Sequence, residues 1–467
     1  MAVWANNIPE WVLLEFGAAL AGLTLVTVNP ANRAAELGHV LEHSGADGLF
    51  LVDEYRGNPM AATVAKLRDR LPRLRETVSF ADWERFCAPG DSGRPLPVVD
   101  PDDPAQILYT SGTTGRPKGA ILHHRGLTNN ARFAQLALGA RAGDVGVNPM
   151  PLFHVAGGGM FTLGTVQSLS THVLMPHFDP TLQLELTETY RGVVFGGVPT
   201  MLLAMLAHPD FARRDLSSVR YGLSGGAPVA PDLVRRIETG LGIPFAITFA
   251  QTEASCSITF IRPAEDGPDD RAETLGRPLP QTEVKVADPG TGEIVPPGTT
   301  GEICARGYLV MTGYLDDPQA TAATIDADGW LHTGDLGSMD ERGYCSIGGR
   351  VKEMIIRGGE NIYPAEVEAA LLTHAGIADA AVVGVHDERW GEQVVAFLRA
   401  AGEDRPTEAE LEAHCRGRLA DFKRPRRWAF VEAFPLTGTG KVRKHVLRER
   451  LEAGELDEPL ADAALGR

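Results

Sequence analysis

The sequence predicts an α/β fold with a large N-terminal domain of mostly parallel sheets flanked by helices, and a small α+β C-terminal domain. Two observations lead to this prediction. Up to about residue 349, short apolar runs typical of strands alternate with amphipathic helical stretches, the pattern of parallel sheets covered by helices. A chain of 467 residues is also too long for one hydrophobic core. We therefore expect domains at 1–349 and 350–455, followed by a tail at 456–467.

The first expected elements are a buried helix and a strand. The longest apolar stretch, 11–28, is interrupted by Glu15 and divided by Gly22. It is therefore interpreted as a buried helix followed by a strand at 23–28, and not as a membrane span. No Lys or Arg precedes the stretch, which argues against a signal peptide.

Further along the N-terminal domain, the pattern predicts helices at 182–190 and 199–207 with a strand at 192–195 between them. Residues 281–306 alternate in polarity around a turn-rich segment at 288–292. This alternation predicts antiparallel strands that form a small barrel-like β subdomain.

The C-terminal domain is expected to mix helices and strands. A helix is predicted at 361–372, with Pro364 in its first turn. Strands are predicted at 380–385 and 393–398, and Thr407 is expected to cap a helix that runs to Leu419.

Composition excludes several classes of partner. The formal net charge is −17, so nucleic acid and anionic membranes would repel the chain. An anionic substrate must therefore meet a locally positive site. The cysteines are scattered, without a Cys-x-x-Cys pair or histidines at metal spacing, which fits a reducing cytoplasm and no structural zinc; they are Cys87, Cys256, Cys304, Cys345 and Cys415.

The most informative stretch is a loop at 109–119, which is rich in glycine and hydroxyl side chains and is closed by Lys118. Glycines allow successive N–H groups to point at one anion, and the hydroxyls and the lysine add donors and charge. The loop lies between strands expected at 105–109 and 119–122. It is not a P-loop, because Pro117 stands where that motif requires glycine. The alternative is a plain surface turn.

This loop resembles the signature of the adenylate-forming superfamily, which comprises acyl-CoA synthetases, luciferases and peptide-synthetase adenylation domains. Other family motifs follow in order over nearly the whole chain, including stretches at 313–321 and 328–336. The resemblance implies that ATP, Mg2+ and CoA are used. It also implies that the active site lies between the domains and that the small domain is mobile, rotating about a hinge at Lys352.

The resemblance implies these site residues. Those that would bind ATP or AMP are Thr110, Ser111, Gly112, Thr113, Thr114, Gly115, Lys118, Gly226, Ala227, Pro228, Thr248, Phe249, Ala250, Thr252, Asp335, Arg350, Asn361 and Lys441. Those that would take part in catalysis are Lys441, Lys118, His154, Thr252 and Glu253, with His154 as a gate beside the acyl site and Glu253 as the magnesium ligand. Those that would bind CoA are Arg357, Gly358 and Gly359.

The chain departs from the family pattern in three places. Phe249 and Ala250 stand where the family usually has tyrosine and glycine. Family members usually carry several dozen residues before the segment matching 2–11, so either the start is placed too late or this portion has been lost.

Two further features are interpreted without a motif. A basic cluster at 422–427 is interpreted as a solvated face that could touch CoA phosphates. Glycines at 157–159, 196 and 197 are interpreted as room for an acyl group.

The leading hypothesis is a cytoplasmic carboxylate–CoA ligase. It would convert a small-molecule carboxylic acid and Mg-ATP to an acyl-adenylate and pyrophosphate, and then transfer the acyl group to CoA, releasing AMP. One alternative is an adenylating enzyme that passes the activated group to a carrier-protein thiol or to a nitrogen nucleophile. Another is a degenerate paralogue that serves as a binding or scaffold protein. The acid and the oligomeric state cannot be read from the sequence.

Overall fold

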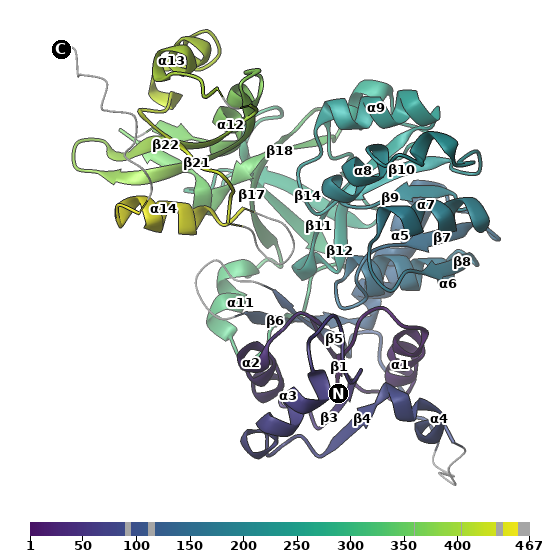
Figure 1. Cartoon of the computed structure of the whole chain (residues 1–467). Helices are drawn as coiled ribbons and strands as arrows, with labels where there is room; N and C mark the ends of the chain where they lie inside the picture. Colours follow the sequence, from purple (N-terminus) through teal and green to yellow (C-terminus); the bar gives the residue numbers. More distant parts are fainter. Residues whose placement is uncertain (89–94, 111–116, 359, 403, 436–441, 456–467) are drawn as a thin grey trace. The chain divides into compact units, whose positions relative to one another are not determined.

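The computed structural model describes residues 1–88, 95–110, 117–358, 360–402, 404–435 and 442–455 (Figure 1). The chain divides into two compact units, each with its own core. The N-terminal unit comprises 1–285, 304–333 and 339–346, and the C-terminal unit comprises 286–303, 334–338 and 347–467. The predicted α/β class, with a large N-terminal and a small C-terminal part, is confirmed.

A seven-stranded sheet opens the N-terminal unit, and five of its strands are parallel. The middle strand of these five is β1, in which Val3 and Trp4 point into different cores, so both faces are covered. The buried helix predicted early in the chain is α1 (Pro9–Leu20) and the strand after it is β2. Across the sheet the strands are β16 (Gly313–Tyr314), β6 (Lys118–His123), β5 (Pro104–Thr110), β2 (Leu25–Val28), β1 (Ala2–Trp4), β3 (Gly48–Leu51) and β4 (Glu76–Ser79). The helices of this part are α1, α2 (Ala34–Ser44), α3 (Met60–Leu67), α4 (Trp83–Phe86) and α11 (Pro318–Thr324).

A five-stranded sheet forms the second half of the N-terminal unit and carries its largest core. The elements predicted between 182 and 207 are present as α7, β9 and α8, and Asp179 caps α7 by accepting a hydrogen bond from the Leu182 N–H at 2.8 Å. The strands are β13 (Arg277–Pro278), β12 (Cys256–Phe260), β11 (Phe245–Gln251), β10 (Tyr221–Gly225) and β9 (Val194–Gly196), with a separate pair β7 (Val145–Asn148) and β8 (Thr171–Leu174). The helices are α5 (His124–Leu138), a π-helix (Ala156–Leu163), α6 (Gly164–Gln167), α7 (Pro180–Thr189), α8 (Pro199–Leu206), α9 (Pro231–Leu241) and α10 (Pro268–Glu273).

A four-stranded sheet follows, and the strands predicted within 281–306 are present in it as β14 and β15. The division between the two units passes through these strands. Their order is β14 (Thr282–Ala287), β15 (Gly301–Gly307), β17 (Leu331–Met339) and β18 (Cys345–Arg350).

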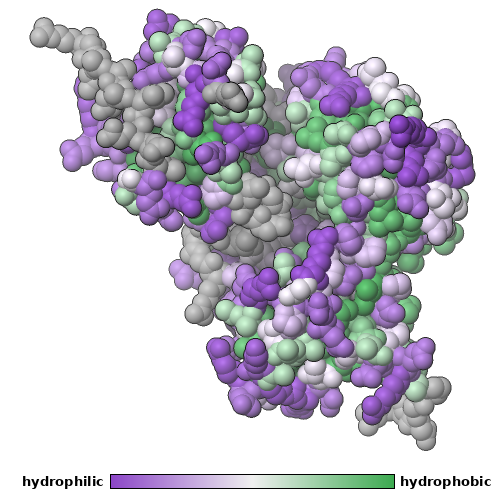
Figure 2. Space-filling model, in the orientation of Figure 1, coloured by the Kyte–Doolittle hydropathy of each residue, from purple (hydrophilic) through white to green (hydrophobic). Residues whose placement is uncertain are grey.

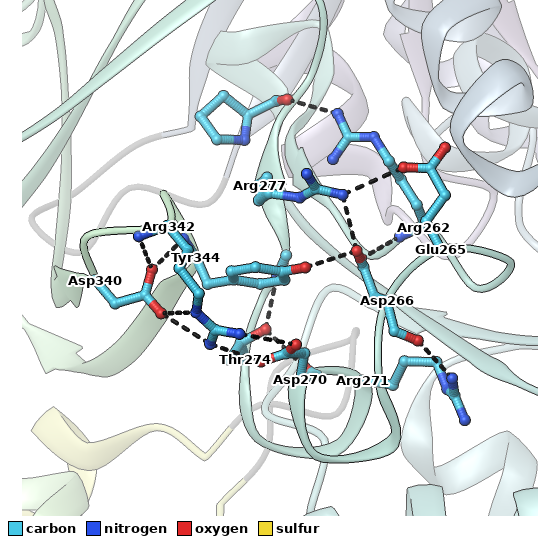
Figure 3. Close-up of polar contacts among 12 residues, drawn as sticks. Arg262, Glu265, Asp266, Asp270, Arg271, Thr274, Arg277, Asp340, Arg342 and Tyr344 are labelled. Atoms are coloured by element: carbon cyan, nitrogen blue, oxygen red, sulfur yellow. Dashed lines mark hydrogen bonds and ion pairs between the residues drawn. The ribbon is translucent and has the colours of Figure 1, made fainter.

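A polar network explains why residues 339–346 belong to the N-terminal unit (Figure 3). The buried Asp266 carboxylate accepts hydrogen bonds from the Tyr344 hydroxyl at 2.7 Å and from the Arg277 guanidinium at 2.9 Å. The Arg342 guanidinium binds the Asp270 carboxylate with two hydrogen bonds of 3.1 and 2.8 Å. Each bond joins residues more than ten positions apart, so the network ties the start of β18 to the loops around α10 and β13.

The C-terminal unit mixes strands and helices, as predicted, but the helix expected at 361–372 begins only at Pro364. Asn361 instead lies in the short strand β20, opposite Ile356 of β19. The strand prevails because Pro364, at the first helical position, starts the helix and leaves the preceding residues free to pair. Thr407 caps α13 as expected, accepting from the Glu410 N–H at 3.4 Å, but that helix ends at Arg416 instead of 419.

The sheet of this unit has the order β20-β19-β22-β21, with β23 paired to β22. The bounds are β19 (Ile355–Arg357), β20 (Glu360–Ile362), α12 (Pro364–Leu372), β21 (Ile377–Asp387), β22 (Gly391–Ala400), α13 (Glu408–Arg416), β23 (Arg427–Phe430) and α14 (Lys444–Glu452).

Hydrophilic side chains predominate on the face seen in Figure 2, with hydrophobic ones in smaller patches among them. Among the described residues, no helix combines the length and the apolar character that crossing a bilayer requires.

Candidate active site

The predicted phosphate loop is carried by a β-hairpin. Strand β5 ends at Thr110 and β6 begins at Lys118, and these two residues are paired across the antiparallel ladder. Between them, Ser111, Gly112, Thr113, Thr114 and Gly115 lie outside the described residues. The structure thus supports the hairpin that would present the loop, while the roles of these five residues stay predictions.

Lys118 has two partners in the N-terminal unit. Its ammonium lies 5.1 Å from the centroid of the Tyr314 ring and 4.0 Å from Asp317 Oδ2. The lysine side chain is 35% exposed. A cation is therefore held at the end of the loop and stays accessible to an anion.

The second predicted motif follows β11 and reaches the same region. Thr252 and Glu253 lie in a single 3-10 turn, Thr252–Ala254. The Tyr314 hydroxyl donates a hydrogen bond to Glu253 Oε1 at 2.8 Å. Burial and the charge of Glu253 raise the pKa of Tyr314 well above its ordinary value, so the phenol stays protonated. Lys118 and Glu253, which come from separate motifs, are thus linked through Tyr314.

The residues just before this turn are engaged in the sheet. Thr248 donates to Ser257 Oγ at 2.9 Å and to the Thr259 carbonyl at 3.1 Å, and Phe249 is buried. The pairing of β11 with β12 shifts register between Phe249 and Ala250. Such an irregularity re-aims the residues after it, and Ala250 and Thr252 are half-buried where Thr248 and Phe249 are buried.

Residues 226–228, which are predicted to bind ATP or AMP and are here called the predicted adenine turn, follow β10 directly. Ser224 and the following glycine are the last residues of β10, not part of the turn. Gly226 has φ +76°, a left-handed conformation that favours glycine. Gly226, Ala227 and Pro228 are all exposed, so their backbone is open to a ligand.

His154 lies in the turn before the π-helix Ala156–Leu163, and its Nδ1 accepts a hydrogen bond from the Ala156 N–H at 3.3 Å. The interpretation of the neighbouring glycines as acyl space is wrong. A Cβ at Gly157 would lie 2.1 Å from the Pro151 carbonyl oxygen, and one at Gly158 would lie 2.7 Å from that of Leu152. These glycines allow two backbone segments to pack closely, and the protein itself fills the room.

A cavity does exist on the other side of the π-helix, and apolar side chains form most of its wall. Met160 and Phe161 line it from the segment that follows His154, and Leu223 lines it from the strand that precedes the predicted adenine turn. The remaining lining residues are Ala134, Gln135, Leu138, Ala140, Asp144, Gly146, Thr165, Ser170, Val193, Val194, Tyr221 and Phe260.

In the C-terminal unit, Asp335 and Arg350 form a direct ion pair. Arg350 Nε lies 3.0 Å from Asp335 Oδ1, and Asp335 is only 3% exposed. The aspartate is on β17 and the arginine ends β18, two adjacent strands. The predicted hinge residue Lys352 follows in the 3-10 turn Val351–Glu353 and is exposed.

Two of the predicted CoA residues, Arg357 and Gly358, lie beside Trp390, which the sequence did not identify as a site residue. The guanidinium groups of Arg357 and Arg389 lie 5.3 and 5.0 Å from its ring centroid. At Gly358, φ is +61° and a Cβ would lie 3.0 Å from the ring, so glycine is required there. Burial and Arg426 lower the pKa of Arg357 below its ordinary value. Gly359 is outside the described residues, as is the side chain of Asn361.

The basic cluster at 422–427 is not the solvated face that was predicted. The Arg424 side chain is 12% exposed and pairs with Asp421, and Lys423 binds Glu366 of α12 at 2.7 Å. The contact of Lys423 joins the cluster to α12, which is far away in sequence.

Lys441 lies outside the described residues, but the helix that follows is anchored. Lys444 Nζ lies 2.7 Å from Glu368 and 2.9 Å from Glu353, the neighbour of Lys352. Burial acts to lower the pKa of Lys444, yet the two carboxylates raise it above its ordinary value.

One cysteine has a histidine beside it, against expectation. Cys304 Sγ lies 3.7 Å from His332 Nδ1 because β15 and β17 are neighbours in the sheet. All five cysteines are free thiols, and burial raises the pKa of Cys256 and Cys345 to about 12, so these two are inert at neutral pH.

Comparison with known proteins identifies the family. The model of the AMP-binding enzymes matches residues 1–315, and that of the AMP-binding enzyme C-terminal domain matches 366–441. The medium-chain acyl-CoA ligase ACSF2, mitochondrial, of Danio rerio is 39% identical over 97% of this chain and 79% of its own.

Two solved structures are similar over nearly the whole chain. ATP-bound MatB from Rhodopseudomonas palustris has a TM-score of 0.87 at 30% identity, covering 97% of this chain and 88% of its own. The o-succinylbenzoate CoA synthetase MenE of Bacillus subtilis, in complex with an acyl-adenylate, has a TM-score of 0.83 at 28% identity, covering 96% and 87%. The chain therefore belongs to the AMP-binding enzymes, in the branch of the acyl-CoA synthetases, which are AMP-forming ligases.

Proposed function

We propose that the protein joins a carboxylic acid to CoA in two steps. A carboxylate oxygen first attacks the α-phosphorus of ATP, which forms the acyl-adenylate and expels pyrophosphate. The CoA sulfur then attacks the acyl carbonyl, its proton passes to solvent, and AMP leaves with the former carboxylate oxygen. We place the reaction in the cytoplasm, because five free thiols fit a reducing compartment.

The observation that carries the first step is the link from Lys118 through Tyr314 to Glu253. Carboxylate and triphosphate repel each other, so an adenylation site must offset negative charge. A lysine supplies one positive charge. The oxygens of Glu253 and Thr252 suit a hard cation such as Mg2+, which when bound would neutralise phosphate oxygens.

Support for the acceptor comes from the surroundings of Trp390. The indole is 40% exposed and carries two guanidinium groups on its ring. Such a surface suits an adenine ring and the phosphates of CoA, because aromatic faces stack on bases and arginine binds phosphate. We propose that Arg357 and Gly358 act there.

For the acid we propose an aliphatic chain. The cavity beside the π-helix is mainly apolar, and Met160 can adapt to a chain that enters it. The Danio rerio relative is by name a medium-chain ligase.

The test is a screen of aliphatic and aromatic acids with Mg-ATP, measuring pyrophosphate, AMP and thioester. We expect pyrophosphate with medium-length aliphatic acids, and AMP with thioester once CoA is added. Absence of pyrophosphate with every acid would contradict adenylation. Turnover that needs a carrier protein or an amine in place of CoA would favour the alternative acceptors.

A further inference from the structure

Tyr314 occupies a position at the edge of the seven-stranded sheet that is fixed by backbone contacts. It lies in the two-residue strand β16, opposite Ala120 of β6. The next residue, Leu315, donates its N–H to the Gly119 carbonyl at 2.8 Å. The Tyr314 backbone is thus bound to the strand that begins with Lys118.

Its side chain makes two contacts of different kinds. The hydroxyl donates to Glu253 Oε1 at 2.8 Å, and the ring lies 5.1 Å from the Lys118 ammonium. A ring face attracts a cation, while a hydroxyl donor fixes the rotation of a carboxylate without neutralising it. Asp317 Oδ2 lies 4.0 Å from the same ammonium, and Asp317 Oδ1 is itself fixed by accepting from the Ala320 N–H at 2.8 Å.

A second tyrosine–carboxylate bond in the molecule gives the contrast. The Tyr344 hydroxyl donates to Asp266, but Arg277 forms an ion pair with that carboxylate at 2.9 Å (Figure 3). The negative charge of Asp266 is therefore already balanced by Arg277. Within the described part of the chain, no lysine or arginine forms an ion pair with Glu253. The charge of Glu253 is therefore not balanced by any described lysine or arginine, which leaves this carboxylate available to a cation.

We propose that Tyr314 is a positioning residue of the Mg-ATP site. Its hydroxyl holds the Glu253 carboxylate in the orientation that receives Mg2+, and its ring holds the Lys118 ammonium beside it. This role rests on the proposed function, since it presumes that Mg-ATP is bound by these two residues.

The test measures ATP affinity by calorimetry with excess Mg2+ and with EDTA, in the wild type and in Tyr314→Phe. The variant loses the hydroxyl and keeps the ring. We expect the gain in ATP affinity that Mg2+ brings to fall by roughly tenfold or more, the usual effect of losing a group that orients a metal ligand. Affinity in EDTA should stay unchanged, because Lys118 keeps its aromatic partner.

Tyr344→Phe is the matched control, since it deletes the same kind of bond where the carboxylate is already paired. It should lower the melting temperature and leave the Mg2+-dependent gain at the wild-type value. In a Glu253→Gln background, Tyr314→Phe should cause no further loss of that gain.

Two results would overturn the role of Tyr314 alone. The first is a Tyr314→Phe variant in which Mg2+ raises ATP affinity as much as it does in the wild type. The second is an equal loss of ATP affinity with and without Mg2+, which would indicate a general structural effect. A wild-type protein that binds no ATP under either condition would overturn the proposed function together with this role.

Discussion

At the scale of single residues, Glu15 is informative in the sequence and again in the structure. In the sequence it interrupts an apolar stretch. In the structure it is 6% exposed and accepts a hydrogen bond from Gln106 Nε2 at 2.6 Å, while its Oε2 has no hydrogen-bond partner among the described residues. Burial raises the pKa of Glu15 to about 8, against which the bond from Gln106 acts only partly. The carboxyl group is therefore protonated at neutral pH.

Glu15→Gln should remove a pH dependence of stability. Between the ordinary value of 4.5 and about 8, the folded state holds a proton that the unfolded state has released. The free energy of unfolding of the wild type should therefore fall as pH rises through this window, by roughly 5 kcal/mol in total. Glutamine keeps the shape and carries no charge, so the variant should lack this slope and be the more stable protein at pH 8. Urea denaturation at several pH values checks this, with Glu10→Gln on the same helix as the control that should keep the slope.

At the scale of elements, the π-helix Ala156–Leu163 depends on its glycines for close approach of two backbones. The turn before this helix contains His154. Within the helix, the side chains of Met160 and Phe161 line the apolar cavity. The element therefore follows the predicted gate directly in the chain and contributes to the wall of the cavity proposed for the acyl chain.

Gly157→Ala should destabilise the protein by about 1–3 kcal/mol, because the added methyl group would lie 2.1 Å from the Pro151 carbonyl oxygen and the backbone must move. Gly17→Ala in α1 is the control. Nothing lies within 4 Å of a Cβ there, so it should stabilise the helix by about 0.5–1 kcal/mol. Thermal unfolding of both variants measures the difference. A neutral Gly157→Ala would show that the segment can rearrange freely.

At the scale of the whole molecule, the predicted residues fall into two compact units. Lys118, His154 and Glu253 belong to the N-terminal unit, and Asp335 and Arg350 belong to the C-terminal unit. Lys441 precedes α14, which Lys444 anchors to Glu353 and Glu368. The family resemblance implies that the small domain rotates between the two half-reactions. In that case a lysine of that domain would serve one half-reaction only.

Lys441→Ala should therefore abolish pyrophosphate release from acid and Mg-ATP, by a factor of at least about a hundred. Thioester formation from supplied acyl-adenylate and CoA should continue near the wild-type rate, because the charge of the triphosphate is then absent. Stopped assays of each half-reaction distinguish the two effects. Equal loss of both half-reactions would place Lys441 in the second step as well. The control for loss of the helix anchor is Lys444→Ala, which should instead lower the melting temperature.

By itself, the sequence determined the fold class, the places of α7, β9, α8, β14 and β15, and the order of the family motifs. These features depend on local periodicity, caps and turn residues, which are set by residues close together in the sequence. Tertiary structure alone decided that the glycines at 157 and 158 pack against backbone, that Lys423 pairs with Glu366 of α12, and that Tyr314 joins Lys118 to Glu253. The glycines depend on the close approach of two backbone segments. The other two depend on contacts between residues distant in the chain, where packing and charge, and not local pattern, choose the partner.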